Sequence, residues 1–349
     1  MATLRSDVII PEIFTPYVIE QTTFRDAFLA SGVVQPMAEL NATEGGDYVN
    51  IPFWKANLTG DFEVLSDSTS LTPGKITADK QVGVILHRGR AFESRDLAAL
   101  AAGADPMAAI GAKVADYVAN QRQKDLLACL AGVFGPIGSS NSSASFAGLT
   151  IDGGGSGETI LSPSHIARAR ALLGDQGDKI SAICMHSAVY YDLVERKAID
   201  YVTNSEARLT TPATGASTIN AVGGSIAEAY ASDASVPFYM GMRVIISDDV
   251  QESGSSPNKK FATYFFTQGA IASGEQMAMA TETDRDILAK SDAMSIDLHY
   301  CYHPIGSKYV TTAGANPNRT VLATMANWTK VYETKNIGIV RATVTSNFD

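Results

Sequence analysis

Cysteine is scarce in this sequence. Its 349 residues include three cysteines, which form no close pair along the chain: Cys129, Cys184 and Cys301. A disulfide framework needs paired cysteines and a structural zinc site usually needs four closely spaced ligands, so neither is expected. The scarcity of cysteine fits a reducing compartment, and we expect the chain to fold in the cytoplasm.

A long uninterrupted apolar run is also missing. The most apolar stretch, residues 97–119, is broken by two aspartates, a lysine and a proline, which makes it too interrupted to cross the roughly 30 Å of hydrocarbon in a bilayer. Residues 1–21 carry acidic residues and two prolines, where a secretory signal needs an apolar core after positive charge. We therefore expect a soluble chain with no export signal and no membrane span.

Charge is sparse and mostly of one sign. Charged residues make up 18% of the chain, the formal net charge is -10, and no basic run is present. Because an acidic surface repels phosphate backbones, sequence-specific binding of nucleic acid is not expected. The hydrophobic fraction of 45% is enough for one large or two modest cores, which excludes wholesale disorder.

The first 45 residues consist of short apolar pieces separated by prolines. Pro11, Pro16 and Pro36 interrupt this region, which favours an extended segment with one short helix near residues 22–31. Such a segment has too few large apolar residues for a core of its own. We expect it to lie on the rest of the chain or on a neighbouring copy.

Residues 46–92 have the composition of a long two-stranded extension. A polar, turn-rich stretch occupies residues 59–79, and the runs that favour strands are 48–53, 62–65 and 81–92. Pro52 indicates an edge strand. Because an isolated two-stranded hairpin is only marginally stable, we expect a partner chain to cover its apolar face. The alternating residues of that face are Val49, Ile51 and Phe53 on the outgoing strand and Val82, Val84 and Leu86 on the return strand.

A long helix is predicted from residue 105 to about residue 134. Asp105 is a suitable N-cap, Pro106 suits the first helical position, and Gly135 and Pro136 stand beyond the end. A helix of this length would run roughly 40 Å, far more than the average helix of a globular domain. We interpret it as a spine.

The remainder of the chain alternates between short helices and strands. Helices are predicted at 164–173, 187–199 and 321–326, and strands at 180–185, 242–247, 261–267, 276–281 and 293–303. This mixture predicts an α+β fold.

Two clusters of chemically versatile residues were weighed as ligand sites. Gly153, Gly154, Gly155 and Gly157 lack the lysine and hydroxyl residue of a phosphate-binding loop and are followed by Glu158, so a flexible loop is the simpler interpretation. His299, Cys301 and His303 alternate along one predicted strand and would share a face. Three alternating residues of one strand are awkward zinc ligands, and we interpret this strand as structural.

Candidates for catalysis are weaker still. No G-x-S-x-G sequence is present, and Cys184 lies in an apolar strand where a thiolate is disfavoured. The acidic pairs Asp248–Asp249 and Asp284–Asp286 are most simply solvated turns. We therefore expect no catalytic residue, no cofactor site and no metal site, and we do not expect an enzyme.

The order of the predicted elements resembles the major capsid protein of tailed double-stranded-DNA bacteriophages. The stretches that are similar to such coat proteins are VIIPEIFTPYVIEQ, GGDYVNIPFWKANLTGDFEVLSDSTSLTPGKITADKQVGVILHRGRAFE, MGMRVIISDDV, YFFTQGAIASGEQ and IDLHYCYHPIGSKYV. The resemblance covers essentially the whole chain. It implies the tailed-phage major capsid fold, with an N-terminal arm (1–45), an E-loop extension (46–92), a P-domain containing the spine helix (93–177), a central A-domain (178–275), and returning strands with a C-terminal tail (276–349).

The resemblance also implies a function and partners. It implies a virion subunit that self-assembles in the host cytoplasm into hexamers and pentamers of an icosahedral head, which encloses double-stranded DNA without sequence-specific binding. A separate scaffolding protein, a portal and decoration proteins are the implied partners. We expect the contacts between subunits to involve the extension and the base of its return strand: Val49, Ile51, Phe53, Trp54, Val82, Val84, Leu86, Arg88 and Arg90.

Other interpretations of the same residues remain open. Some relatives cross-link lysine to asparagine, and Lys55, Lys75 and Lys80 lie in the corresponding extension, although solvated loop lysines are the simpler interpretation. An encapsulin-like nanocompartment would share the fold and enclose cargo enzymes, and co-purifying nucleic acid would argue against it. A soluble α+β enzyme that uses the glycine cluster or the His299 strand would instead form small oligomers with a bound cofactor.

Overall fold

The spine of the fold is one long helix, α3 (Pro106–Phe134). Its 29 residues give a length of roughly 44 Å at 1.5 Å per residue. Proline at the first position suits a helix start because its missing N–H is not needed there. At the other end Gly135 takes a positive φ of 73°, and its N–H donates to the carbonyl of Ala131 at 2.8 Å. The predicted helix at 105–134 is therefore confirmed.

A computed structural model describes residues 28, 31–41, 46–55, 62, 76–97, 106–137, 146–152, 160–203, 235–256 and 259–348. Most of the predicted N-terminal arm, the tip of the extension and the glycine cluster at 153–157 lie outside these residues. The chain divides into two units, and each is described by itself. Unit 1 comprises 1–136, 140–148 and 269–337, and unit 2 comprises 137–139, 149–268 and 338–349.

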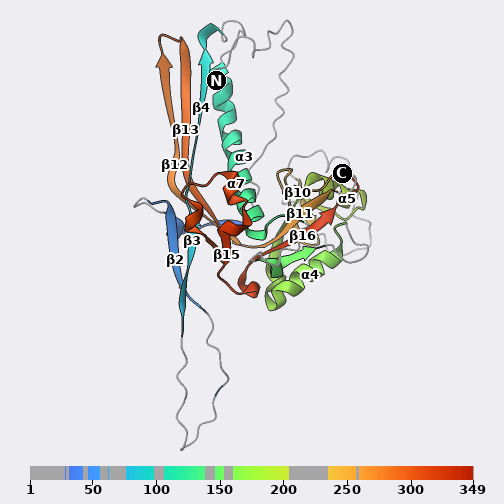
Figure 1. Ribbon diagram of the computed structural model, residues 1–349. Helices are drawn as coiled ribbons and strands as arrows, with labels where there is room; N and C mark the ends of the chain where they lie inside the picture. Colours follow the sequence, from blue (N-terminus) through green and yellow to red (C-terminus); the bar gives the residue numbers. More distant parts are fainter. Residues whose placement is uncertain are drawn as a thin grey trace, which may run out of the picture. The chain divides into compact units, whose positions relative to one another are not determined.

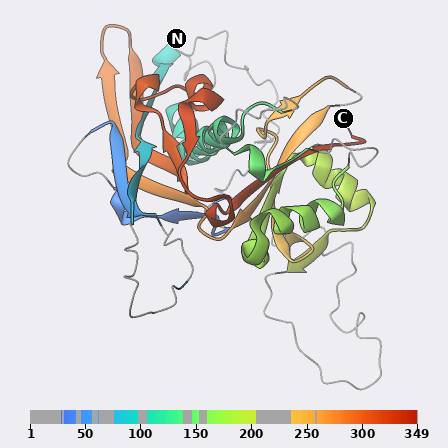
Figure 2. The same cartoon turned by 60° about the horizontal axis from the view of Figure 1, so that its bottom comes forward.

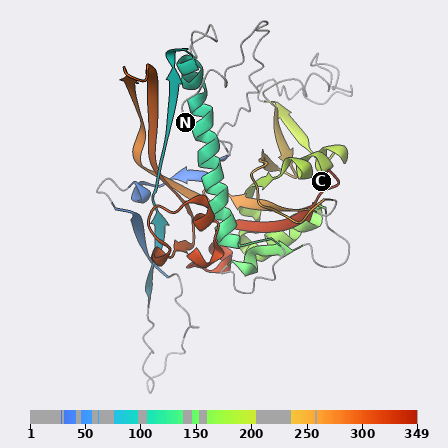
Figure 3. The same ribbon diagram turned by 45° about the horizontal axis from the view of Figure 1, so that its top comes forward.

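Unit 1 contains a sheet of long strands that runs beside α3 (Figures 1 and 3). Its order is β1 (Val34–Pro36), β12 (Ile271–Asp286), β13 (Ser291–Pro304) and β4 (Leu86–Arg95). The last three strands are antiparallel neighbours, and β1 joins β12 in parallel. The predicted strands at 276–281 and 293–303 are the central parts of the much longer hairpin β12–β13. Phe92 of β4 packs edge-on against Tyr117 of α3 at 5.6 Å.

A second sheet of unit 1 holds the base of the predicted extension. Its order is β15 (Trp328–Lys330), β14 (Ser307–Tyr309), β3 (Ala78–Val84) and β2 (Tyr48–Trp54). β2 lies at the edge, as Pro52 predicted. The expectation of an isolated two-stranded hairpin was wrong at this base, because β3 also pairs with β14. The remaining helical turns of unit 1 are η2 (Ala38–Leu40), η6 (Thr311–Ala313), α7 (Arg319–Leu322), η7 (Met325–Asn327) and η8 (Thr334–Asn336).

The predicted return strand at 81–92 is divided between these two sheets. The chain leaves one strand and enters the next at Ile85, so that β3 pairs with β2 whereas β4 pairs with β13. Ile85 itself is 1% exposed and belongs to a buried apolar cluster with Leu40, Val49, Ala272 and Cys301. Burial of this one side chain anchors the crossing point between the sheets.

Unit 2 contains an eight-stranded sheet. The helices of this unit are drawn in green in Figure 2. The path of the sheet is β5 (Thr150–Asp152), β16 (Ile339–Thr345), β11 (Lys260–Thr267), β6 (Ile180–Met185), β9 (Met242–Ile246), β8 (Ser235–Tyr239) and β7 (Asp200–Thr203), and β10 (Glu252–Ser253) pairs with β11. The helical segments of this unit are α4 (Pro163–Leu173), η4 (Gly174–Lys179) and α5 (Ser187–Glu195). The turn η3 (Ala147–Leu149) falls where unit 1 ends at residue 148 and unit 2 resumes at residue 149. Strands β6, β9 and β11 confirm three sequence predictions, and α5 ends four residues before the predicted Ile199.

Helix α4 belongs to this unit, whereas the predicted P-domain (93–177) places the same residues with the spine helix. Its first turn begins after Ser162, whose hydroxyl lies 3.0 Å from His165 Nδ1. Among the described residues, no helix is both long and apolar enough to cross a membrane.

The end of the spine helix makes an unusually close contact. A β-carbon added to Gly132 would lie 2.0 Å from the carbonyl oxygen of Leu322 and 2.4 Å from Trp328 Nε1. These two groups are themselves hydrogen-bonded, since the Trp328 indole N–H donates to Leu322 O at 2.7 Å. Glycine is therefore required at position 132, because any side chain would force the α7 segment and Trp328 away from the helix.

We predict that Gly132→Ala destabilises the subunit. Alanine is the better helix former by about 1 kcal/mol, but overpacking a tight contact costs about 1–3 kcal/mol, and here the obstacle is backbone. Thermal unfolding should show a lower melting temperature for Gly132→Ala. The matched control is Gly148→Ala, whose new methyl group would meet nothing closer than Thr334 at 3.9 Å. Equal melting temperatures for both variants would contradict the close packing.

Candidate functional site

The nine residues predicted to contact a neighbouring subunit divide into a buried and an exposed group. Val49, Val82, Val84 and Leu86 are at most 8% exposed and pack inside unit 1. The apolar face that was expected to await another chain is therefore filled at these four positions by the subunit's own sheets. At these positions the covering groups come from the same chain, and the intervening residues Gln81 and Ile85 are buried as well.

The remaining apolar residues of this set lie along β2 and keep accessible surface. Ile51 and Phe53 are partly exposed, and Trp54 is 67% exposed. Phe53 packs edge-on against Tyr332 with ring centroids 4.7 Å apart. Phe53 and Trp54, together with the chain from Lys330 onward, line an open groove of about 650 Å³.

An ion pair fixes the point where the extension leaves this groove. Lys55 Nζ lies 3.0 Å from Asp79 Oδ2, and the Lys55 N–H donates to Thr77 O at 2.8 Å. The hydrogen bond from Lys55 holds the pKa of the Asp79 carboxyl below its usual range, with a further contribution from the N–H of Lys80. Of the three lysines weighed for cross-linking, Lys55 is thus engaged within the subunit, and Lys75 lies outside the described residues.

A buried polar network lies beneath the groove. Gln81 Oε1 accepts a hydrogen bond from Gly306 N at 2.9 Å and lies 3.0 Å from His303 Nε2. The Gln81 amide donates to Tyr332 Oη at 2.8 Å. Since Oε1 can only accept, His303 must carry its proton on Nε2. The network joins strands β3 and β13 to the chain segment after β15.

The alternating residues His299, Cys301 and His303 are therefore structural parts of this region. Cys301 is buried in the apolar cluster around Ile85, and burial raises the pKa of its thiol to about 12. The His299 ring packs edge-on against His87 at 4.3 Å. In the part of the chain that the structure describes, no group of three metal-ligating side chains gathers.

We predict that His303 makes the stability of the subunit depend on pH. Burial lowers the pKa of His303 from 6.5 to about 4, so that the folded state holds this imidazole neutral while the unfolded chain protonates it. The stabilisation is complete above pH 6.5 and is lost as the pH falls toward 4, by about 3 kcal/mol. In His303→Gln, which retains a donor, the unfolding free energy should fall less over this range. Identical pH profiles for the variant and the original chain would contradict this assignment.

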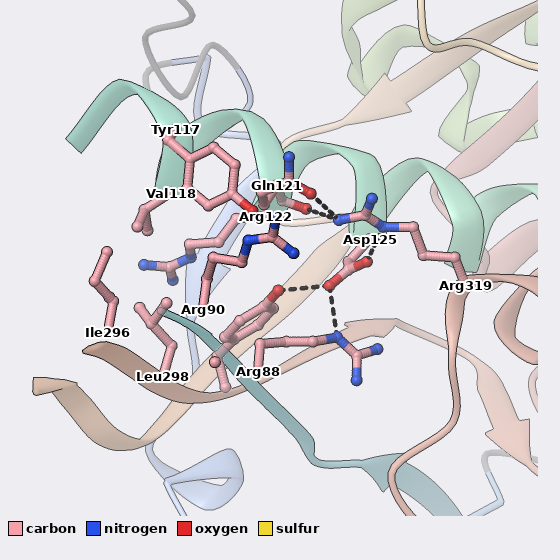
Figure 4. A pocket seen from close by; sticks show the side chains of 12 residues that line it. Arg88, Arg90, Tyr117, Val118, Gln121, Arg122, Asp125, Ile296, Leu298 and Arg319 are labelled. Atoms are coloured by element: carbon pink, nitrogen blue, oxygen red, sulfur yellow. Dashed lines mark hydrogen bonds and ion pairs between the residues drawn. The ribbon is translucent and has the colours of Figure 1, made fainter. Parts of the chain in front are cut away.

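The strongest electrostatic feature of unit 1 is a fully buried carboxylate on the spine helix (Figure 4). Asp125 is 0% exposed, and its two oxygens are shared among three donors. Arg88 Nε lies 3.1 Å from Oδ2, Tyr300 Oη donates to the same oxygen at 2.6 Å, and Arg319 Nε approaches Oδ1 at 2.5 Å. Burial, followed by the charge of Asp125, raises the pKa of the Tyr300 phenol, which keeps it protonated as a donor.

The two arginines that bind Asp125 also donate hydrogen bonds to other groups. Arg319 also donates to Gln121 Oε1 at 2.6 Å and to Gln121 O at 3.1 Å. Arg88 donates to Asn316 Oδ1 at 2.9 Å and to Pro317 O at 2.7 Å. The carboxylate therefore ties helix α3 to β4, β13 and the start of α7. Arg88 was expected to be available for a neighbouring subunit, but in the structure it is committed to this network.

Beside Asp125 is a small cavity of about 110 Å³ with an excess of positive charge. Arg122 lies over the Tyr300 ring at 5.2 Å and donates to Tyr302 Oη at 3.0 Å and to Glu275 Oε1 at 2.8 Å. Arg90 lines the same cavity (Figure 4), is exposed, and forms no ion pair with any described residue. Arg90 is thus the arginine of this cluster whose charge could pair with a group outside the described residues.

The candidates for catalysis occupy structural positions. Cys184 is 0% exposed in β6, and burial raises the pKa of its thiol well above the usual value. Asp248 accepts from the N–H of Ser187 at 3.3 Å, and Asp286 accepts from two N–H groups of the β12–β13 turn. Asp248 lies in a turn, as the sequence indicated, whereas Asp284 and Asp286 belong to strand β12, so the predicted turn at this second pair was wrong. Nothing in the sequence indicated Asp125, because a single aspartate within a helix has no signature of burial.

We predict that Asp125→Asn destabilises the subunit strongly. The amide is isosteric, but it leaves Arg88 and Arg319 without their shared counter-ion, and breaking a buried ion pair from one side costs about 3–5 kcal/mol. The partial exposure of both arginines reduces this to about 3 kcal/mol. Chemical denaturation is the measurement, and Asp116→Asn, an exposed aspartate of the same helix, is the control. A loss below 1 kcal/mol would show that Asp125 is not the anchor of this network.

Comparisons with known proteins agree with one another. The model of the Gp13-like family, described as "Major capsid protein 13-like", matches residues 37–338. The chain is 37% identical to the "Major capsid protein" of Bacillus phage SPP1 over an alignment of 344 residues, and the match covers 96% of this chain and 96% of that protein. Three capsid structures share its fold at low identity. They are the capsid asymmetric unit of cyanophage Pam1 (13% identical, 90% and 89% of the two chains covered, TM-score 0.54), the capsid of Ralstonia phage GP4 (9%, 90% and 87%, 0.54) and the mature capsid of bacteriophage PhiM1 (13%, 97% and 92%, 0.53).

Proposed function

Because the chain belongs to the Gp13-like family of major capsid proteins, we propose that it is the shell-forming subunit of a tailed-phage head. The observation that carries this proposal is the 37% identity to a phage major capsid protein along 96% of both chains. Its work is structural, and its functional residues are those that contact other subunits. We further propose hexamers and pentamers as the building units, with double-stranded DNA enclosed inside.

The proposal extends to partners and to the place of assembly. Each subunit has a net charge of -10, so a shell of such subunits has a net charge that repels DNA. Enclosure of the genome is therefore driven by another component and not by attraction to the shell. We propose that the shell assembles in the host cytoplasm with a separate scaffolding protein, that a portal joins it, and that decoration proteins bind its surface.

The predicted extension at 46–92 is proposed as the element that reaches a neighbouring subunit. Its base is rigid, because β3 is held on both sides within the four-stranded sheet. Its outer strand β2 is an edge that carries the partly exposed Phe53 and the exposed Trp54, and an unpaired strand edge is a template for another chain. Ile51, Phe53, Trp54 and the available cation Arg90 are the residues of the original set that we propose for this contact.

We predict that replacing residues 57–75 with a short turn of glycine and serine blocks shell closure while the subunit stays folded. The strand ends are held independently by the Lys55–Asp79 pair, so the melting temperature should stay within a few degrees. Electron microscopy and sedimentation under assembly conditions should find oligomers but no closed shells.

A second variant replaces the same residues with a glycine and serine linker of unchanged length. Failure of this variant as well would show that the side chains of the extension, and not merely its reach, make the contact. Closed shells formed normally by the short-turn variant would contradict the proposed role, and unfolding of that variant would show that the extension belongs to the subunit's own core.

A further inference from the structure

The cavity beside Asp125 carries more positive charge than the carboxylates around it neutralise. Four arginines line the cavity: Arg88, Arg90, Arg122 and Arg319. Two carboxylates pair with them, Asp125 and Glu275, which leaves two positive charges in excess. The whole chain has a net charge of -10, so the surplus is local. Cations gathered in one small space repel one another unless an anion balances them.

Several guanidinium N–H groups at this cavity are not used within the described part of the subunit. Arg319 donates through Nε and Nη2, which leaves its Nη1 without an acceptor among the described residues. Arg122 likewise donates through Nε and Nη2 alone. Arg90 lines the cavity and makes no hydrogen bond to a described side chain. The three side chains reach the cavity from three elements, α7, α3 and β4 (Figure 4).

The walls and the size of the cavity suit one small anion. Ile296 is 1% exposed and lines the cavity together with Val118 and Leu298, and charges interact more strongly beside such apolar groups than in water. The volume of about 110 Å³ is several times the roughly 30 Å³ of one water molecule. It is well below the roughly 300 Å³ at which pockets begin to hold a drug-sized ligand. An oxyanion with a few waters fits, whereas a nucleotide does not.

We propose that this cavity binds one small tetrahedral oxyanion of the inorganic phosphate type, held by the unused N–H groups of Arg90, Arg122 and Arg319. Guanidinium groups suit this ligand because their planar forks donate two N–H groups to two oxygens at once. The bound anion joins β4 to α3 and α7 beside the Asp125 network and neutralises the surplus charge. The site goes beyond the proposed shell function and does not rest on it, because all of its residues belong to one subunit.

Equilibrium dialysis of the unassembled subunit with radiolabelled inorganic phosphate, at constant ionic strength, tests the site. The original chain should retain about one phosphate per chain at saturation. Arg90→Gln should bind phosphate at least about tenfold more weakly, because it removes a charge-assisted hydrogen bond. Arg90→Lys keeps the charge without the planar fork and should restore part of the affinity. The matched control is Arg95→Gln, at an exposed arginine of the same strand that does not line the cavity, and it should bind phosphate as the original chain does.

Thermal unfolding gives a second measurement of the same site. Phosphate also stabilises folded proteins by being excluded from their surface, so the difference between variants reports the site. Saturating phosphate should raise the melting temperature of the original chain and of Arg95→Gln by about 3–5 °C more than that of Arg90→Gln. In chloride alone, Arg90→Gln should not lower the melting temperature, because the charge that it removes has no partner among the described residues.

Other occupants of the cavity give different results. Failure of the original chain to retain phosphate, or equal retention by Arg90→Gln, would overturn the site. Displacement of the phosphate by a short single-stranded oligonucleotide would overturn the small oxyanion in favour of a nucleic-acid phosphate. No phosphate binding, combined with loss of shell closure in Arg90→Gln, would overturn it in favour of a carboxylate from a neighbouring copy. Phosphate retained by a chain that never forms shells would support the site and overturn the proposed function.

Discussion

The interaction on which unit 1 depends is the ion cluster around Asp125. A carboxylate without exposed surface costs several kcal/mol to desolvate, and it is tolerated only when its oxygens are fully matched by donors. Here Arg88, Tyr300 and Arg319 supply those donors from three segments that are far apart in the sequence. Each segment is placed relative to α3 by the same group, so the long sheet and the α7 region cannot move independently of the spine. The close approach at Gly132 then completes the contact between α3 and the α7 region.

The features that the sequence predicted are those that local chemistry determines. The spine helix was located to within a residue because Pro106 and Gly135 mark its ends, and Pro52 marked β2 as an edge. The division of residues 81–92 between two sheets was missed because Val82, Val84 and Leu86 keep the same alternation on both sides of Ile85. Alternation shows that one face is covered but not which chain covers it, and Val49 is accordingly buried in its own subunit. The partners of Asp125 were unpredictable for a similar reason, since they are fixed only by tertiary folding.

The structure separates residues that make the subunit from residues that remain available to others. Several groups make their contacts within the subunit: the inner face of the β2–β3 base, the Gln81 network, and the two arginines that bind Asp125. Among the described residues of unit 1, the most exposed large apolar side chains include Trp54 at the end of β2 and Leu288 in the turn between β12 and β13. Rigid elements that end in exposed apolar groups allow contacts in several directions without weakening the core, which is what a closed shell requires of a repeated subunit.

Small contacts at the ends of rigid elements also explain how a shell can correct errors and still be stable. Each contact of a few side chains is weak by itself, so a misplaced subunit can dissociate before its neighbours enclose it. In a closed lattice the contacts act together, because the second and third are made by a subunit that the first already holds in place. The ordering of each end within the subunit is essential to this scheme. At the base of the extension, β3 is paired on both sides and Lys55 pairs with Asp79, so the contact proposed there would lose little entropy on binding.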